Sequence, residues 1–149
     1  MKFVHTIQVS VFVKPGEDEE KIRESLSSLA PFDLEEEKVA LKKTVAKGVD
    51  EFSTKITIYE LMLEKERHTR KFIEHLLSRL STDQKKMLLR QEDRLGDDCC
   101  FYLRLDKQKL LDKEAWITDL GDCFHVKMTI AAFPKKKEAA RTVVEKMLS

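Results

Sequence analysis

The sequence is poor in the residues that build several common kinds of site. Its 149 residues include no asparagine, four glycines, three prolines and three cysteines. The lack of asparagine removes every N-glycosylation acceptor and one of the two amide side chains that read adenine with paired hydrogen bonds. Every glycine and proline falls between expected helices and strands, and neither GxGxxG nor GxxxxGK occurs. Nucleotide-dependent chemistry is therefore disfavoured.

Long hydrophobic runs and an excess of one charge are absent too. No apolar run reaches the roughly 18 residues of a spanning helix, and the opening residues lack the apolar stretch of a secretory signal. We therefore expect a cytoplasmic protein with no membrane contact. The 28 basic and 27 acidic residues leave a net charge of +1, which excludes a globally basic nucleic-acid-binding protein. The length and the 42% apolar content fit one domain over residues 1–149.

What the sequence has in abundance is charge of both signs. Charged residues make up 37% of the chain, against about 25% in an average globular protein. Together with the missing asparagine, this composition is typical of proteins whose ion pairs work at high temperature. We therefore expect a thermophilic source.

Cysteines and histidines do not form a recognisable chemical site. Cys99, Cys100 and Cys123 have no CxxC spacing, so we expect buried, free thiols in place of zinc ligands. His68 and His75 are about 10 Å apart along a helix axis, too far to bind one metal ion, and we assign both to the surface. We expect no catalytic residues, no metal, no cofactor and no enzymatic activity.

Hydrophobic periodicity predicts an α+β fold. Alternating residues indicate strands at 3–13, 39–45, 55–63, 99–105 and 124–130, with His5, Ile7 and Val9 on one face of the first. Helical patterns follow residue 17, cover 67–80 and 81–96, and start again at Pro134. The strands show a polar face, which favours a single, mostly antiparallel sheet of about five strands with helices packed mainly on one face.

Charge is unevenly distributed along the chain. Residues 1–50, 51–100 and 101–149 carry net charges of −2, 0 and +3. The strongest basic cluster opens the last predicted helix and contains Lys135, Lys136, Lys137 and Arg141. Cations oppose the helix dipole at that position, whereas the free N–H groups of a helix start favour phosphate. A locally unfavourable cluster of this kind indicates a function.

The segment FYLRLDKQ at residues 101–108 carries a family resemblance. It is similar to the LYLRLDKQ signature of small archaeal proteins described as predicted RNA-binding proteins and predicted exosome subunits with a double-stranded-RNA-binding-like fold. The opening strand, the acidic helix start and the Phe-Pro before a basic helix extend the likeness over most of the chain. Many relatives carry a Gly-Asn-Pro turn before the third strand, where this chain has residues 48–54.

The resemblance implies an accessory protein that binds structured or double-stranded RNA with little sequence specificity. Within the signature region it implies contacts from Arg104, Lys107, Gln108 and Lys109, with Gln108 as a partner for a 2′-hydroxyl. The basic cluster at residues 135–141 would add phosphate contacts. Exosome or ribosome-related assemblies are the partners it suggests, whereas a homodimer is the partner of the alternative considered next.

A protein-interaction module without RNA binding is the alternative. It would use an exposed strand edge or the apolar stretch of Leu110, Leu111 and Trp116 to dimerise or dock. A metal-dependent nuclease is a third hypothesis, for which the sequence offers no clustered metal ligands.

Overall fold

Five strands, five α-helices and one 3₁₀ helix follow one another in the computed structural model, which describes residues 2–46, 55–119 and 121–149. In chain order they are β1 (Val4–Val13), α1 (Glu19–Ser28), β2 (Leu41–Ala46), β3 (Ile56–Leu63), α2 (Glu66–Arg79), α3 (Thr82–Arg90), the 3₁₀ helix η1 (Glu92–Arg94), β4 (Cys100–Asp106), α4 (Lys107–Leu111), β5 (Cys123–Ile130) and α5 (Lys137–Leu148). Residues 48–54, where the chain departs from the family pattern, lie outside the described residues.

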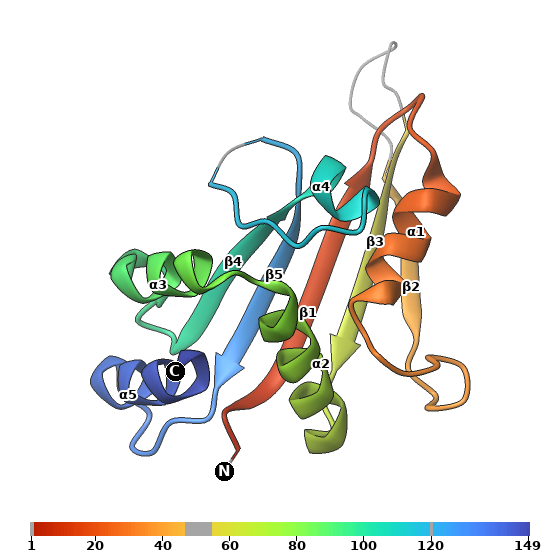
Figure 1. Cartoon of the computed structure of the whole chain (residues 1–149). Coiled ribbons are helices and arrows are strands. Elements are labelled where there is room, and N and C mark those ends of the chain that lie inside the picture. The colour runs from red at the N-terminus through yellow and green to blue at the C-terminus, as the bar shows by residue number, and fades with distance from the viewer. Residues whose placement is uncertain (1, 47–54, 120) are drawn as a thin grey trace.

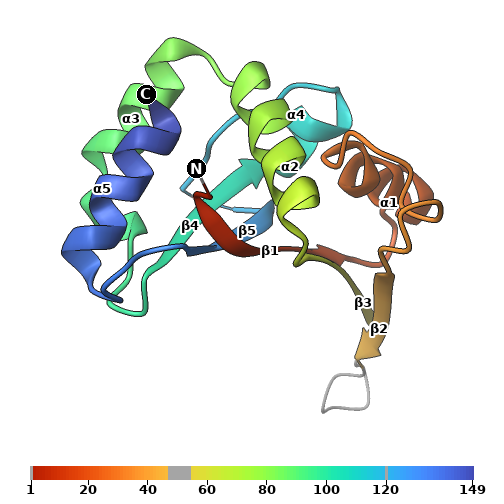
Figure 2. The ribbon, with the colours of Figure 1, turned by 90° about the horizontal axis from the view of Figure 1, so that it is seen from below.

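The strands form one sheet in the order β2-β3-β1-β5-β4, and all neighbours are antiparallel (Figure 1). Figure 2 shows the helices on one side of this sheet, with the opposite face left open. The predicted α+β fold is confirmed, including the placement of helices on one face. No helix in the described ranges is long and apolar enough to cross a bilayer.

The core lies between the sheet and the helices. Ile7, Val9 and Val11 of β1 are completely buried there, together with Leu26 of α1 and Phe72 of α2. Burying one such side chain contributes roughly 1.5–3 kcal/mol relative to leaving it in water. This apolar layer fixes which face of each strand is turned away from the helices.

The start of β1 departs from the predicted alternation. Its register against β5 shifts between Val4 and Thr6, which marks a bulge or irregularity. Val4 is consequently buried while His5 is exposed, so the placement of His5 on the face of Ile7 was wrong. An extra residue in one strand reverses the side-chain alternation beyond it.

Helix boundaries agree with the sequence where a side chain caps the helix. The Ser81 hydroxyl accepts a 3.2 Å hydrogen bond from the Gln84 N–H and starts α3 as predicted.

Two other helix boundaries differ from the prediction. Helix α3 ends at Arg90 rather than at residue 96, because η1 follows it. The last helix starts at Lys137 and not at Pro134, since a turn closed by Lys136 N–H and the Pro134 carbonyl (2.8 Å) comes first.

His68 is not a surface residue. Its side chain is 2% exposed, its ring stacks on Phe32 with centroids 4.6 Å apart, and Nε2 lies 3.3 Å from Glu37 Oε2. The acidic turn after α1 thus folds back onto α2, a contact between distant segments that the helical pattern could not reveal.

Candidate nucleic-acid interface

We define the open face as the side chains of the sheet that point away from the helices. Successive residues of a strand point to opposite sides, so the neighbours of buried core residues belong to it. It consists of Thr6, Gln8, Ser10 and Phe12 of β1, Lys42, Thr44 and Ala46 of β2, Ile56, Ile58, Glu60 and Met62 of β3, Cys100, Tyr102, Arg104 and Asp106 of β4, and Cys123, His125, Lys127 and Thr129 of β5.

Cross-strand pairing orders these side chains into rows. One row crosses all five strands as Lys42, Glu60, Ser10, His125 and Arg104. The neighbouring row holds Met62, Gln8, Lys127 and Tyr102. Arg104 and Lys127 thereby become diagonal neighbours on adjacent strands. The carboxylates among the side chains that define the open face are Glu60 and Asp106, and Asp106 is engaged in capping α4.

Two aromatic rings stand on the open face. Phe12 is 42% and Tyr102 is 40% exposed. The Phe12 ring meets the His125 ring edge-on, with centroids 6.3 Å apart. The Tyr102 hydroxyl donates a 2.8 Å hydrogen bond to Asp98 Oδ2, which raises the pKa of Tyr102 to about 12. Both rings are held by neighbours and yet remain accessible to a ligand.

A polar pocket of about 390 Å³ opens beside β4. Its lining residues are Gln91, Asp93, Arg94, Tyr102, Arg104 and Asp119. Arg94 is ion-paired with Asp119, and Arg104 Nη1 donates to the Asp119 carbonyl at 3.1 Å. The Arg104 side chain is exposed and positioned where the pocket meets the open face, as expected for a predicted contact residue.

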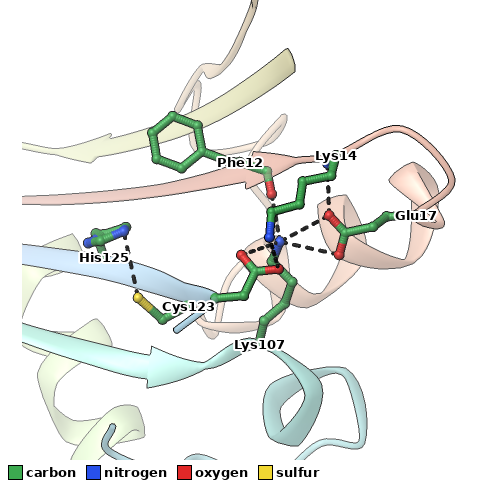
Figure 3. Close-up of polar contacts among 7 residues, drawn as sticks. Phe12, Lys14, Glu17, Lys107, Cys123 and His125 are labelled. Carbon is green, nitrogen blue, oxygen red and sulfur yellow. Dashed lines mark hydrogen bonds and ion pairs between the residues drawn. The ribbon is translucent and has the colours of Figure 1, made fainter. Parts of the chain in front are cut away.

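Lys107, by contrast, is not at the surface. Its side chain is completely buried, and Nζ lies 2.7 Å from the Phe12 carbonyl, 2.8 Å from Asp122 and 3.2 Å from Glu17 (Figure 3). These partners use all three donors of the ammonium group. The predicted phosphate contact of Lys107 is corrected here: the residue ties β1, the start of α1 and the segment before β5 together.

The rest of the signature region is exposed on α4, a short helix that the sequence did not predict. Asp106 caps it by accepting from the Lys109 N–H at 2.9 Å, and Leu110 anchors it in the core. Gln108 and Lys109 point outward. Lys109 Nζ is 3.7 Å from Glu114 and 5.7 Å from the centre of the Trp116 ring, so this cation already has local partners.

The basic cluster before and within α5 divides into two pairs. Lys137 lies 3.7 Å from Asp97, and Arg141 lies 3.6 Å from Glu92. Lys135 and Lys136 are exposed, and no ion pair in the described parts of the chain involves them. Lys136 occupies the N-cap position of α5 without a side-chain hydrogen bond. The two exposed lysines are therefore the members best able to meet a phosphate.

The two predicted basic regions lie at opposite ends of the β4–β5 hairpin. α4 follows the end of β4, where Asp106 pairs with Cys123, whereas Ile130, at the end of β5, bonds to Cys99 before β4. The same pairing separates Cys99 from Cys123, as expected, and all three cysteines are buried and free. Between the two ends, Arg104 and Lys127 carry positive charge along the open face.

Cys123 and His125 form a close pair on this hairpin, with Sγ and Nε2 3.6 Å apart (Figure 3). Burial raises the pKa of the Cys123 thiol. Burial and then the charge of Arg104 lower the pKa of His125. Both shifts favour the neutral forms at neutral pH, which is the opposite of the thiolate and imidazolium of an activated nucleophile.

Phe12, Tyr102 and Lys127 are the interface residues that sequence reasoning did not select. Their signal was the alternation itself: Tyr102 and Arg104 are separated by buried Leu103, and Lys127 lies between buried Val126 and Met128. Which polar faces of separate strands share one surface depends on strand order, which the sequence does not state.

Fold and site define a two-layer α+β protein whose open antiparallel sheet presents basic and aromatic side chains. A family model described as RNA binding matches residues 6–130, and the chain belongs to this RNA-binding family. The family resemblance seen in residues 101–108 is thereby confirmed.

Relatives and solved structures agree with this assignment. The chain is 32% identical over 145 residues to RNA-binding protein PAB1135 of Pyrococcus abyssi, covering 97% of this chain and 93% of that protein. It is 28% identical to Mth689, a DUF54 protein from Methanothermobacter thermautotrophicus, with a TM-score of 0.79 over 99% of both chains. Protein AF2318 from Archaeglobus fulgidus, also DUF54, gives a TM-score of 0.82 at 28% identity over 97% of this chain and 99% of that one.

Proposed function

We propose that this protein is a non-catalytic accessory protein that binds structured RNA with low sequence specificity. Arg104 and Lys127 contact phosphates from the open face, and Lys135 and Lys136 do so from the end of the hairpin. Membership of the RNA-binding family supports RNA as the ligand, and the exposed cations of the open face support this face as the binding site. RNA carries one negative charge per nucleotide, so exposed cations supply most of a nonspecific affinity.

The observation that carries this proposal is the one-sided cover of the sheet (Figure 2). Helices shield one face, while the other exposes Arg104, Lys127 and Lys42. The carboxylates among its defining residues are Glu60 and Asp106, and Asp106 is engaged in capping α4. A polyanion approaching this face meets attraction without the core being disturbed. Gln108 and Lys109, exposed beyond the end of β4, extend the surface toward a backbone that reaches that end.

Lys137 and Arg141 have a secondary role in the proposal. Their contacts with Asp97 and Glu92 are 3.7 Å and 3.6 Å long and partly exposed. Exposed ion pairs of this kind contribute about 0–1 kcal/mol. A phosphate can displace such a carboxylate at low cost, so the two residues act as additional contacts.

The decisive experiment is a salt titration. Fluorescence anisotropy with a structured RNA is measured at several salt concentrations for the wild type and for the double variant Arg104→Gln, Lys127→Gln. We expect the slope of log affinity against log salt to flatten by about 1.4 to 1.8, from 0.7 to 0.9 per lost phosphate contact. Lys71→Gln with Lys86→Gln on the helical layer is the matched control and leaves the slope unchanged. An unchanged slope in the first double variant contradicts the proposed site.

A protein-interaction module remains the second candidate, because β2 is an open sheet edge. Among residues 2–46, 55–119 and 121–149, β3 is its one strand neighbour, and five of the six residues of β2 are exposed. The outer edge of β4 is instead covered by bridges from Leu95 and Ile117, and Leu110 is buried in the core. Homodimerisation through β2 predicts a mass of twice 17.4 kDa in light scattering, and a monomer at micromolar concentration contradicts it.

The proposal has three further parts: association with an exosome or ribosome-related assembly, a cytoplasmic location and a thermophilic source. The first comes from the family resemblance, and the other two come from sequence composition. The assembly is tested by using the tagged protein to capture exosome subunits from its native lysate. The capture should persist after ribonuclease treatment.

A further inference from the structure

We propose that the open face binds unpaired nucleotides, with bases stacked on Phe12 and Tyr102. The preferred ligand is then a structured RNA that presents a single-stranded loop or end, and not a continuous duplex. This inference rests on the RNA-binding function proposed above and specifies the class of RNA.

The two rings are spaced as separate stacking positions. Tyr102 shares a row with Lys127 and Gln8, and Phe12 lies four residues beyond Gln8 on β1. Strands are about 4.8 Å apart and rise about 3.3 Å per residue, which places the two ring positions about 10 Å apart across the strands and about 13 Å apart along them. Two bases of one strand therefore need not compete for the same ring.

Both rings are fixed before a ligand arrives. The Tyr102 hydroxyl is bound to Asp98 at 2.8 Å, and Phe12 is in edge contact with His125. A side chain that is already ordered loses little conformational entropy on binding. Met62, 41% exposed at the β3 end of the row of Tyr102, adds apolar surface on the other side of β1. Exposed apolar groups gathered on one functional face are typical of a binding surface.

Cations flank Tyr102 at positions suited to the sugar-phosphate backbone. Lys127 is the direct cross-strand neighbour of Tyr102, and Arg104 follows Tyr102 on the same face of β4. A base stacked on Tyr102 thus leaves its own phosphate near a cation. In an A-form duplex the bases are stacked on one another and their faces are inaccessible, so a duplex could use the cations but not the rings.

The pocket beside β4 favours a base over a phosphate. It shares Tyr102 and Arg104 with the open face, and its other side carries Asp93 together with Asp119, which is ion-paired with Arg94. Carboxylates repel phosphate but accept hydrogen bonds from the amino groups of bases. A base that slides past Tyr102 into this 390 Å³ space therefore meets acceptors along its edge.

The test compares two RNAs and a small set of variants. An RNA hairpin with an eight-nucleotide unpaired loop and the corresponding fully paired duplex are titrated by anisotropy, and 2-aminopurine in the loop reports stacking. We expect the loop RNA to bind at least tenfold more tightly than the duplex and its fluorescence to be quenched. Phe12→Leu and Tyr102→Leu should each lower loop affinity by roughly 5- to 100-fold, the usual worth of one stacked base.

Matched controls separate stacking from folding. Tyr102→Phe keeps the ring and loses the hydroxyl, so its affinity should stay within about threefold of wild type. Leu89→Ala removes an exposed apolar side chain from the helical layer and should change nothing. Thermal unfolding confirms that each variant is folded under the assay conditions.

The outcomes distinguish this inference from the function on which it rests. The stacking inference is overturned if the loop RNA and the duplex bind equally well and the two Leu variants lose no affinity. If Arg104→Gln, Lys127→Gln still flattens the salt slope in that case, the RNA-binding function is left in place. Absence of binding to either RNA overturns both. Loss of loop affinity in the Leu variants, with the duplex unaffected by them, supports the inference.

Discussion

Basic residues at the two ends of the β4–β5 hairpin form similar clusters in the sequence but differ in burial in the fold. At one end, Lys107 is completely buried among Glu17, Asp122 and a backbone carbonyl; at the other, Lys135 and Lys136 are exposed. The difference shows that a cluster of cations does not define a binding surface by itself. The partners that the fold brings to each ammonium group decide whether that group stabilises the protein or remains available to a ligand.

Physical chemistry explains why the two ends are not interchangeable. Removing a charge from water costs several kcal/mol unless opposite charges and hydrogen bonds replace the solvent. Lys107 has such partners in three segments that are distant in sequence. An exposed lysine keeps its hydration and exchanges it for a phosphate with release of counterions.

Replacement of Lys107 by Met should have the largest effect. The variant removes the buried cation that Glu17 and Asp122 share, and we expect the free energy of unfolding to fall by about 3 kcal/mol. Urea unfolding at pH 7 measures this loss. Lys109→Met, at an exposed position of the same helix, should change stability by less than about 1 kcal/mol. Equal stability of the two variants would contradict the structural role of Lys107.

The opposite end should respond in RNA binding and not in stability. We expect Lys135→Gln with Lys136→Gln to flatten the salt dependence of RNA affinity by about 1.4 to 1.8. The free energy of unfolding should stay within about 0.5 kcal/mol of wild type, because both side chains are exposed. Anisotropy and urea unfolding on the same samples provide the two measurements. A stability loss like that of Lys107→Met would show that these lysines are structural too.

Acid should weaken the Lys107 end selectively. Burial favours a higher pKa for Asp122, but the hydrogen bond and charge of Lys107, with Lys14 adding, outweigh it and lower that pKa below 3.8. A carboxyl group with a lowered pKa in the folded protein stabilises the fold at pH values above the ordinary pKa of aspartate. This stabilisation is lost as the pH falls through the pKa of the group in the folded protein.

Urea unfolding between pH 2.5 and 6 is the measurement for this acid effect. The wild type should lose stability below about pH 4, the ordinary range of aspartate. Lys107→Met should lose less over the same interval, because its Asp122 keeps only the smaller effect of Lys14 to lower the pKa. If stability falls equally with pH in the wild type and in Lys107→Met, the ion pair of Asp122 with Lys107 does not cause the acid effect.

The smallest effect concerns His125, midway along the hairpin. Burial, followed by the charge of Arg104, lowers its pKa. An NMR titration should therefore find a midpoint below the ordinary histidine value of about 6.5. In Arg104→Gln the midpoint should rise without reaching that value, since burial, the larger cause, remains. No movement would mean that Arg104 is turned away from His125.

Much of the fold followed from local patterns. Alternation located β1, β3, β4 and β5 because one face of each strand is buried in the core, and the Ser81 cap located the start of α3. The turn that precedes α5 was misread because Pro134 fits the first position of a helix equally well. Helix α4 was missed because five residues are too few for a periodic signal, although Asp106 and Leu110 supply its cap and its anchor.

The structure leaves Arg104, Lys135 and Lys136 exposed, and their RNA contacts stay a prediction, whereas it buries Lys107. Phe12 and Lys127 of the open face were not selected from the sequence, because they belong to strands outside the family signature. His68 was misplaced for the same reason, since its partners Phe32 and Glu37 precede it by more than thirty residues.

The sequence by itself determined the α+β class, the polar and apolar faces of the strands, the family and the uneven distribution of charge. These properties depend on residues close together in the chain. The tertiary structure alone decided the strand order β2-β3-β1-β5-β4, the burial of Lys107 and the meeting of Phe12, Tyr102, Arg104 and Lys127 on one face. Such outcomes depend on long-range pairing, in which desolvation and the supply of partners act between segments that the sequence keeps apart.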